Sequence, residues 1–187
     1  MEAPILNMIG QKVALGPLDR TLLPMYQRWN NDFETTRTLA RSWPTTAEAE
    51  ARTYEAMATA TDGVFFTVYD PASSRAIGLA YLWPVDFVHR AAEFGMVIGE
   101  AEFRGQGRGT ETTRLLLAYA FRVLGLHGVT LKVYAYNEAG VRAYEKAGFR
   151  TFGVQREAHQ RGGQMWDVVH MQCLAREFSG PVLSFAR

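Results

Sequence analysis

Phe103-Arg104-Gly105-Gln106-Gly107-Arg108-Gly109-Thr110 is the stretch that decides the fold, because it sets three glycines in alternate positions directly before a helical segment. The run 111–124 has no glycine or proline and carries its apolar residues on one stripe, as an amphipathic helix does. The first N–H groups of a helix lack partners, and the helix dipole adds positive charge there. The stretch therefore predicts an anion site suited to a phosphate group, to which Arg104 and Arg108 can add charge.

Length and composition favour a single soluble domain. The 187 residues fit one domain spanning 1–187, with 179–187 as a C-terminal extension, and the net charge of +1 gives no bulk attraction for nucleic acid or anionic lipid. The single cysteine excludes an internal disulfide framework. Without a secretory signal or a long apolar run at the N-terminus, we expect a cytoplasmic protein with no membrane or nucleic-acid partner.

Periodicity and turn residues predict a mixed α/β fold. Helices are predicted at 22–33, at 47–60, at 110–124 and after Asn137. A strand–helix–strand unit around the glycine loop requires a crossover, so two strands are parallel there, whereas short turns make the others antiparallel. We therefore predict a largely antiparallel sheet of six to seven strands with a parallel central pair, flanked by helices. The predicted strands are 13–18 (as an edge strand), 64–69, 77–83 (stopped by Pro84), 91–98, 129–135, 149–155 and 165–173.

Other phosphate-binding loops fit the glycine stretch poorly. A dinucleotide fold places Gly-x-Gly-x-x-Gly after its first strand, whereas here Thr112 stands at the last glycine position and several elements precede the loop. A nucleoside-triphosphate loop requires Gly-Lys-Ser/Thr, and no lysine precedes Thr110. A glycine-rich turn that only tightens a strand–helix connection remains the alternative, although three glycines in five positions favour a backbone requirement.

Arg104-x-x-Gly107-x-Gly109 resembles the acetyl-CoA pyrophosphate loop of the GNAT N-acetyltransferases. The flanking segments 92–98, 124–127, 137–140 and 144–149 agree with that family, most closely with its RimJ/RimL-like branch, which acetylates ribosomal-protein N-termini, and with spermidine-acetylating relatives. The N-terminal half matches only loosely. The resemblance implies the GNAT fold, in which the two parallel strands splay apart.

The resemblance implies an enzyme that transfers an acetyl group from acetyl-CoA to a primary amine by direct attack in a ternary complex. The acceptor classes are a protein N-terminus, a polyamine, an amino acid and an amine-bearing antibiotic. Acetyl-CoA is the co-substrate, no metal is implied, and a homodimer is possible. The alternative is a non-catalytic module that binds acetyl-CoA for sensing or assembly.

Two catalytic residues follow from the resemblance. Glu93 occupies the place of a glutamate that acts as a base, often through water; the alternative is an ordinary strand glutamate paired with Arg90 or a neighbouring strand. Tyr144 occupies the place of a tyrosine that protonates the departing thiolate, and the alternative is a core aromatic. Some RimL-like proteins use a serine where this chain has Gly140, which leaves Tyr144 as the evident acid.

The cofactor contacts implied by the resemblance lie on three elements. Backbone groups of Val97 and Ile98 would bind the pantetheine arm, with the N–H of Val97 as the donor to the developing oxyanion. Asn137 would cap the following helix and contact the same arm. The loop itself would hold the pyrophosphate through Arg104, Gly105, Gln106, Gly107, Arg108, Gly109 and Thr110.

Three tryptophans are predicted to contact the substrate. Trp43, Trp83 and Trp166 lie in or beside the segments 29–43, 83–90 and 159–166, which border the open end of the cleft in this fold. For Trp43, packing in the core is an open alternative. Glu100, Glu102 and Glu111 are considered as carboxylates for a cationic acceptor. The four histidines show no metal-ligand spacing, so no metal site is predicted.

Overall fold

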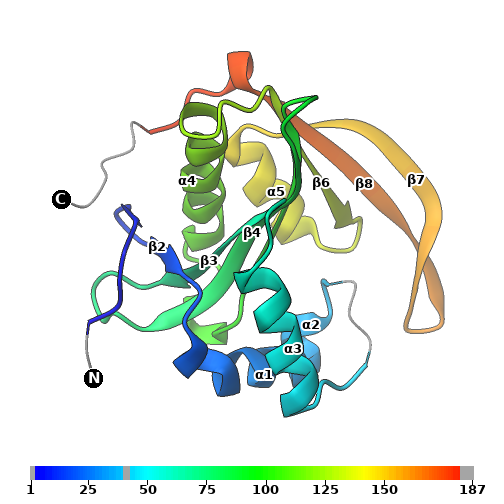
Figure 1. The fold of residues 1–187 in the computed structure, drawn as a ribbon. Helices are drawn as coiled ribbons and strands as arrows, with labels where there is room; N and C mark the ends of the chain where they lie inside the picture. Colours follow the sequence, from blue (N-terminus) through cyan, green and yellow to red (C-terminus); the bar gives the residue numbers. More distant parts are fainter. Residues whose placement is uncertain (1–2, 40–42, 182–187) are drawn as a thin grey trace.

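The computed structural model describes residues 3–39 and 43–181 (Figure 1). Eight strands in the described residues form one sheet in the order β1-β2-β3-β4-β5-β6-β8-β7. The strands are β1 (Met8–Ile9), β2 (Ala14–Pro17), β3 (Val64–Tyr69), β4 (Ala76–Asp86), β5 (Ala91–Ile98), β6 (Gly128–Tyr134), β7 (Arg150–Arg161) and β8 (Gln164–Leu174). The α-helices are α1 (Leu23–Asn31), α2 (Phe33–Thr36), α3 (Ala47–Ala58), α4 (Arg108–Arg122) and α5 (Glu138–Ala147).

The sheet confirms the predicted mixed topology. Strands β5 and β6 are parallel, and every other neighbouring pair is antiparallel. The parallel pairing joins only Ala91–Glu93 to Gly128–Thr130, so the rest of β5 parts from β6. This is the predicted splayed pair. The sheet has one strand more than predicted, because β1 is only two residues long and is too short to show an alternating pattern in the sequence. Since β1 pairs with β2, the prediction that β2 is an edge strand was wrong.

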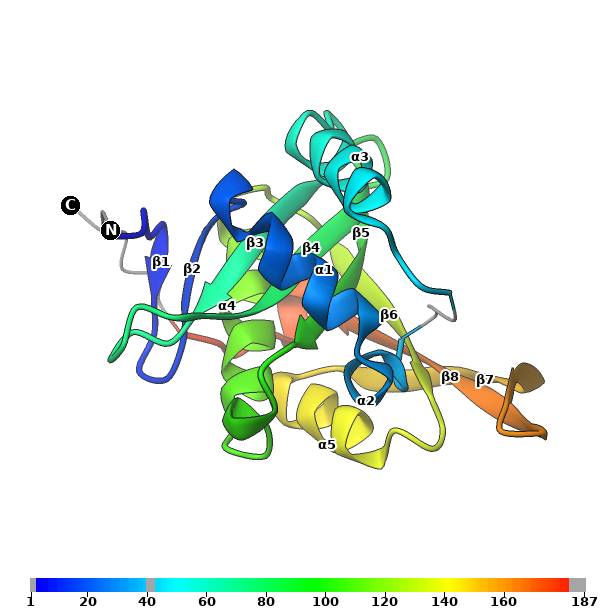
Figure 2. The ribbon, with the colours of Figure 1, turned by 90° about the horizontal axis from the view of Figure 1, so that it is seen from below.

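Helices cover both faces of the sheet. Figure 2 shows α1 and α3 on one face and α4 and α5 on the other. On the α4 side the core includes Leu116 and Phe94, and the ring of Phe94 meets the ring of Tyr144 edge-on at 5.9 Å. Successive strand residues point to opposite faces, so Glu93, Gly95 and Val97 project to the side of α1 and α3.

Several predicted element boundaries were wrong. The strand predicted to end at residue 155, for example, runs to Arg161. The helix predicted at 22–33 breaks at Asp32, whose carboxylate accepts hydrogen bonds from the N–H groups of Glu34 and Thr35 and so starts α2. Strand β4 continues through Pro84 to Asp86, because the register shifts between Leu82 and Val85 and Pro84 lies in that irregularity, where no ladder donor is needed.

Candidate active site

The loop before α4 has the backbone geometry of an anion site. Gly105 and Gly107 have φ values of 72° and 80°, which a side chain would disfavour. Gly107 is the N-cap of α4 and makes no side-chain capping bond, and the first intrahelical bond runs from Glu111 N–H to Gly107 C=O at 3.1 Å. The N–H groups before Glu111 therefore have no partner within the helix. These donors fit the pyrophosphate of a bound acetyl-CoA.

The side chains of Arg104 and Arg108 both have partners within the protein, and their contact with the cofactor stays a prediction. Arg104 donates to the C=O of Ile98, the last residue of β5, at 2.9 Å. Arg108 is paired with Asp70 at 2.8 Å and lies over the ring of Phe103 at 4.7 Å. Both guanidinium groups are turned inward, because buried acceptors from distant segments compete for them.

Other cations surround the start of α4. Lys12, in the β1–β2 turn, donates through Nζ to the C=O of Gln106 at 2.9 Å. A groove of about 750 Å³ lies along this turn and α4, and its lining includes Lys12, Gly107, Thr110, Arg114 and Lys146. The sequence did not indicate Lys12, Arg114 and Lys146, because only the fold brings these three cations to one groove.

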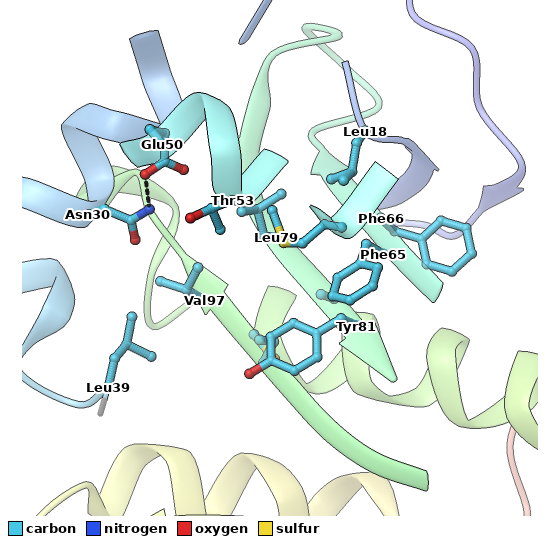
Figure 3. A pocket seen from close by; sticks show the side chains of 13 residues that line it. Leu18, Asn30, Leu39, Glu50, Thr53, Phe65, Phe66, Leu79, Tyr81 and Val97 are labelled. Atoms are coloured by element: carbon cyan, nitrogen blue, oxygen red, sulfur yellow. Dashed lines mark hydrogen bonds between the residues drawn. The ribbon is translucent and has the colours of Figure 1, made fainter. Parts of the chain in front are cut away.

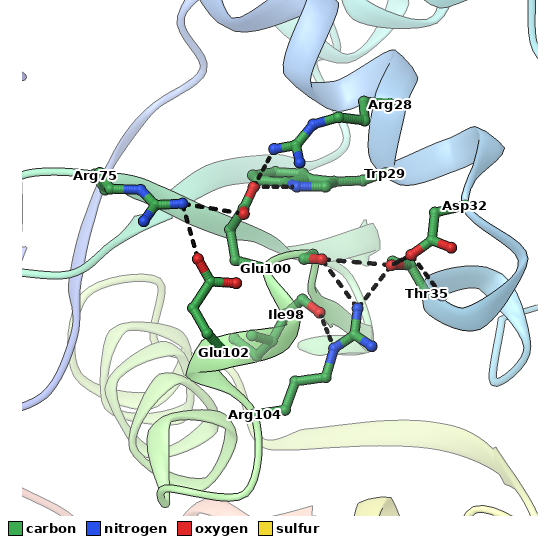
Figure 4. Close-up of polar contacts among 10 residues, drawn as sticks. Arg28, Trp29, Asp32, Thr35, Arg75, Ile98, Glu100, Glu102 and Arg104 are labelled. Carbon is green, nitrogen blue, oxygen red and sulfur yellow. Dashed lines mark hydrogen bonds and ion pairs between the residues drawn. The ribbon is translucent and has the colours of Figure 1, made fainter.

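The glutamates considered for a cationic acceptor have other partners. The carboxylate of Glu100 accepts hydrogen bonds from Trp29 Nε1 at 2.8 Å and from Arg75 at 3.1 Å, and Glu102 pairs with Arg75 at 3.0 Å (Figure 4). Glu111 accepts from two N–H groups of the β1–β2 turn, at 2.7 and 2.6 Å. All three therefore hold elements together, which argues against their use as acceptor ligands.

A Gly107→Ala substitution tests the loop. A side chain at φ 80° costs about 1–2 kcal/mol, and its Cβ would lie 3.2 Å from Lys12 Nζ. We expect the Michaelis constant for acetyl-CoA to rise about tenfold, measured by steady-state kinetics. Gly153→Ala, where a Cβ meets nothing within 4 Å, is the control. Equal Michaelis constants for acetyl-CoA in Gly107→Ala and Gly153→Ala would contradict the assignment of this loop to the cofactor.

Glu93 forms an ion pair across the parallel strands. Its Oε2 lies 2.9 Å from Nζ of Lys132 in β6, and the two side chains are 39% and 56% exposed. The partner is Lys132 rather than Arg90, which donates instead to the C=O of Gly125. An exposed pair of this kind contributes little to stability, so it leaves the carboxylate open to a second role.

Tyr144 lies on α5, against the other side of the parallel strands. Burial raises the pKa of its phenol to about 12, and Tyr81 adds to the shift. The pKa of Tyr81 is raised by burial and by the Glu93 carboxylate. Tyr81 is therefore near both predicted catalytic residues. The sequence did not indicate this, because Tyr81 lies on a different strand, β4, and only the fold brings the three residues together.

Tyr81 also explains the glycine in the middle of β5. A Cβ on Gly95 would lie 2.2 Å from Cζ of Tyr81, so the ring lies directly over the strand. Because Gly95 is opposite Tyr81 in the ladder, only a residue without a side chain leaves room for the ring there.

The alternation of hydrogen bonds between β4 and β5 shows which way the backbone N–H groups at the end of β5 point. The N–H of Gly99 donates to Ile77 C=O at 2.8 Å, which makes these two residues a hydrogen-bonded pair. Leu79 and Val97 are then the next such pair. The N–H of Val97 is consequently directed toward β4, whereas that of Ile98 faces the splayed side. Ile98, not Val97, has the better direction for an oxyanion donor.

Asn137 has the predicted capping role. Its Oδ1 accepts a hydrogen bond from the N–H of Gly140 at 3.0 Å, at the start of α5. A Cβ on Gly140 would lie 2.5 Å from Nδ2 of Asn137, so a serine there would displace the cap. A contact of Asn137 with the cofactor stays a prediction.

The three predicted substrate tryptophans lie on different elements: Trp43 precedes α3, Trp83 is on β4 and Trp166 is on β8. Trp43 is 79% exposed, so the packing interpretation was wrong, and Trp83 is half exposed. Trp166 packs edge-on against Tyr136 at 5.1 Å, within an aromatic cluster in which Tyr134 stacks on His159 at 3.8 Å. Register and alternation put Trp166 on the same face as Lys132 and Glu93. Substrate contact by these residues stays a prediction.

A pocket of about 280 Å³ lies on that same face, between α1, α3 and strands β3 to β5 (Figure 3). Apolar and aromatic side chains, among them Phe65, Leu79 and Val97, form most of its wall. Glu50 of α3 also lines it, is 1% exposed, and accepts a hydrogen bond from Asn30 at 2.8 Å. An acidic group in an apolar wall suits an alkyl amine.

Within residues 3–39 and 43–181, no group of three His, Cys, Asp or Glu side chains is arranged to hold a metal ion. Within the same ranges, every helix is too short or too polar to cross a bilayer.

Comparisons with known proteins give a consistent family. The model of the "Acetyltransferase (GNAT) domain" matches residues 12–150. The chain is 32% identical over 111 residues to a spermidine N(1)-acetyltransferase of Vibrio cholerae, covering 59% of this chain and 64% of that protein. It is 28% identical over 170 residues to the Escherichia coli K12 enzyme of the same name, covering 87% and 86%.

A solved structure agrees with the fold. The crystal structure of spermidine N-acetyltransferase from Vibrio cholerae in complex with CoA and spermine superposes with a TM-score of 0.83 at 27% identity, covering 90% of this chain and 98% of that one. Since the family model covers most of the sequence and the splayed sheet carries the expected anion loop, the chain belongs to the GNAT acetyltransferase family and is an acetyl-CoA-dependent N-acetyltransferase.

Proposed function

We propose that the acceptor is a polyamine of the spermidine type. The observation that carries this proposal is the pocket of about 280 Å³ whose mostly apolar wall contains the buried Glu50. A polyamine alternates methylene runs with ammonium groups, so its chain suits Phe65 and Leu79 and its charge suits a carboxylate. The similarity to two spermidine acetyltransferases supports the same acceptor class.

In the proposed reaction the acceptor nitrogen approaches from the face of Glu93. An alkyl ammonium has a pKa of about 10, so the amine must lose a proton before it attacks, and Glu93 accepts that proton directly or through water. The nitrogen then bonds to the acetyl carbonyl carbon and loses its second proton to water, and the carbon–sulfur bond breaks, which leaves a neutral amide. The Ile98 N–H stabilises the developing oxyanion.

Tyr144 completes the proposed reaction from the other side of the parallel strands. Its phenol donates a proton to the leaving thiolate, whose thiol has a pKa of about 8–9. A pKa of about 12 keeps the phenol protonated at neutral pH, so the donor form is always present. The phenolate regains its proton from solvent after the thiol leaves.

The Glu50→Gln variant tests the acceptor class. We expect kcat/KM for spermidine to fall about 10- to 100-fold, since a hydrogen bond to a charged group contributes about 1.5–3 kcal/mol. Hexylamine, which carries no second ammonium group, should lose much less. Glu55→Gln is the matched control, because Glu55 lies on the same helix with its side chain exposed. Thiol release is followed for both amines in the wild type and the two variants. It gives the ratio of kcat/KM for spermidine to kcat/KM for hexylamine in each protein.

Several outcomes would redirect this proposal. Turnover of N-terminal peptides in preference to spermidine would favour the RimJ/RimL-like prediction and a protein acceptor. Coenzyme A binding without turnover of any amine would favour the non-catalytic module. An unchanged spermidine preference in Glu50→Gln would remove Glu50 from the acceptor site. The homodimer, the single-domain organisation and the cytoplasmic location stay predictions.

A further inference from the structure

Arg104 joins two segments that lie far apart in the sequence (Figure 4). Its Nε donates to the C=O of Ile98 at 2.9 Å, and its Nη2 donates to the C=O of Gly99 at 2.9 Å and to Oγ1 of Thr35 at 2.7 Å. Thr35 lies on α2 and is buried. One guanidinium therefore fastens the end of β5 to a helix on the acceptor face.

The end of β5 needs such a partner. Beyond Glu93 the strand has parted from β6, so the open-side C=O of Ile98 has no strand to accept from. A backbone acceptor left without a partner away from water is costly, and Arg104 supplies the missing donor. Because Arg104 is also the first residue of the cofactor loop, the strand end and the loop are held by the same side chain.

The connection continues into α2 itself. Thr35 also donates through its hydroxyl to Asp32, the residue that caps α2, and this hydrogen bond lowers the pKa of the Asp32 carboxyl. The chain Arg104–Thr35–Asp32 therefore ends at the start of the helix. A shift of Arg104 would disturb the cap.

A second link runs in parallel. The carboxylate of Glu100, in the segment between β5 and the loop, is 5% exposed. It binds Arg28 and Trp29 of α1. Residues 98–104 are thus tied to both α1 and α2, and both helices lie on the face of the acceptor pocket.

We propose that Arg104 is a positioning residue that couples acetyl-CoA binding to the acceptor side of the enzyme through Thr35 of α2. Occupation of the loop fixes Arg104, which holds Thr35 and the α2 cap in place. The extension to amine binding rests on the proposed polyamine function; the coupling between loop and helix does not.

Neighbouring buried threonines offer a matched test. Thr35→Val removes the contact with Arg104. Thr36→Val removes a hydroxyl whose one hydrogen bond among the described residues is to the C=O of Asp32, at 3.1 Å. We expect the dissociation constant of coenzyme A, measured by titration calorimetry, to rise about fivefold or more in Thr35→Val and less than about twofold in Thr36→Val, in line with usual coupling energies. Thr35→Ser, which keeps the hydroxyl, should restore tight binding.

Hydrogen exchange gives a readout that a merely structural role would not produce. In the wild-type protein, coenzyme A should slow exchange in peptides covering residues 29–39, although α2 is not part of the loop. Thr35→Val should abolish this slowing, and Thr36→Val should keep it. Equal behaviour of the two valine variants, or failure of Thr35→Ser to restore both signals, would overturn the coupling.

Spermine binding tests whether the coupling extends to the acceptor side. Its dissociation constant should fall in the presence of coenzyme A in the wild type and change less in Thr35→Val. Absence of spermine binding, with the coenzyme A contrasts intact, would refute the polyamine proposal and leave the coupling supported. Spermine turnover without those contrasts would refute the coupling alone.

Discussion

The Tyr144→Phe enzyme is expected to lose a factor of about 10² to 10⁴ in kcat, the usual contribution of a positioned general acid. Its coenzyme A affinity and melting temperature should stay close to those of the wild type. Within the described residues the phenol oxygen makes no hydrogen bond, so its removal leaves no partner unsatisfied, and the ring keeps its packing on Phe94 and Phe149. Steady-state kinetics and calorimetry separate the two effects.

The pH dependence follows from the raised pKa of Tyr144. The active form of an acid is the protonated one, and a pKa of about 12 keeps the phenol protonated until the pH rises toward that value. The ratio of wild-type to Tyr144→Phe kcat should therefore be constant from about pH 6 to about pH 10. Tyr119→Phe, a partly buried tyrosine of α4 packed on Phe66, is the control and should retain full activity. A ratio that declines within this range would contradict the acid role.

The Glu93→Gln enzyme should lose about 10²-fold or more in kcat, because glutamine keeps the size of the side chain and cannot accept the amine proton. The loss should be largest at low pH, where more of the amine is protonated. Rates of spermidine acetylation from about pH 6 to about pH 9, at saturating acetyl-CoA, measure both effects.

Lys132→Gln separates catalysis from the ion pair. It removes the same 2.9 Å contact and leaves the Glu93 carboxylate in place. If Glu93 is the base, Glu93→Gln is impaired far more than Lys132→Gln. Equal and small effects in the two variants would reduce Glu93 to a surface ion pair, which contributes at most about 1 kcal/mol.

The cofactor half of the molecule could be predicted from the sequence, because its features depend on local interactions. Positive φ at Gly105 and Gly107 and the uncapped start of α4 depend on residues next to one another in the chain. Asn137 caps α5 through a residue three positions away. Such features need no knowledge of distant segments, so the strand, loop and helix around them could be predicted.

Long side chains were predicted less well. Arg104 and Arg108 are adjacent to the loop, and their sequence positions indicate phosphate contacts. Their partners Thr35 and Asp70 lie 69 and 38 residues away, and only the folded sheet brings them within reach. The same holds for Lys12, which meets the loop from 94 residues away.

The acceptor half of the molecule was the hardest to predict from the sequence. Glu50 reads in the sequence as an ordinary position of an Ala-rich helix, and Tyr81 as one aromatic of a strand. Both residues line the pocket that α3, β4 and β5 enclose together, and this shared position is the basis of the role proposed for Glu50. A pocket is a property of surfaces from several elements, and no local pattern encodes it.

The sequence by itself determined the mixed sheet, the parallel pair and the anion loop, because periodicity, turn residues and helix starts are set by neighbouring residues. The tertiary structure alone decided which cations line the groove beside α4, which N–H at the end of β5 faces the splayed side, and that Arg104 binds Thr35 of α2. The direction of the N–H follows from the register between β4 and β5, and the positions of the cations and of Arg104 follow from which partners the folded chain brings within hydrogen-bonding reach.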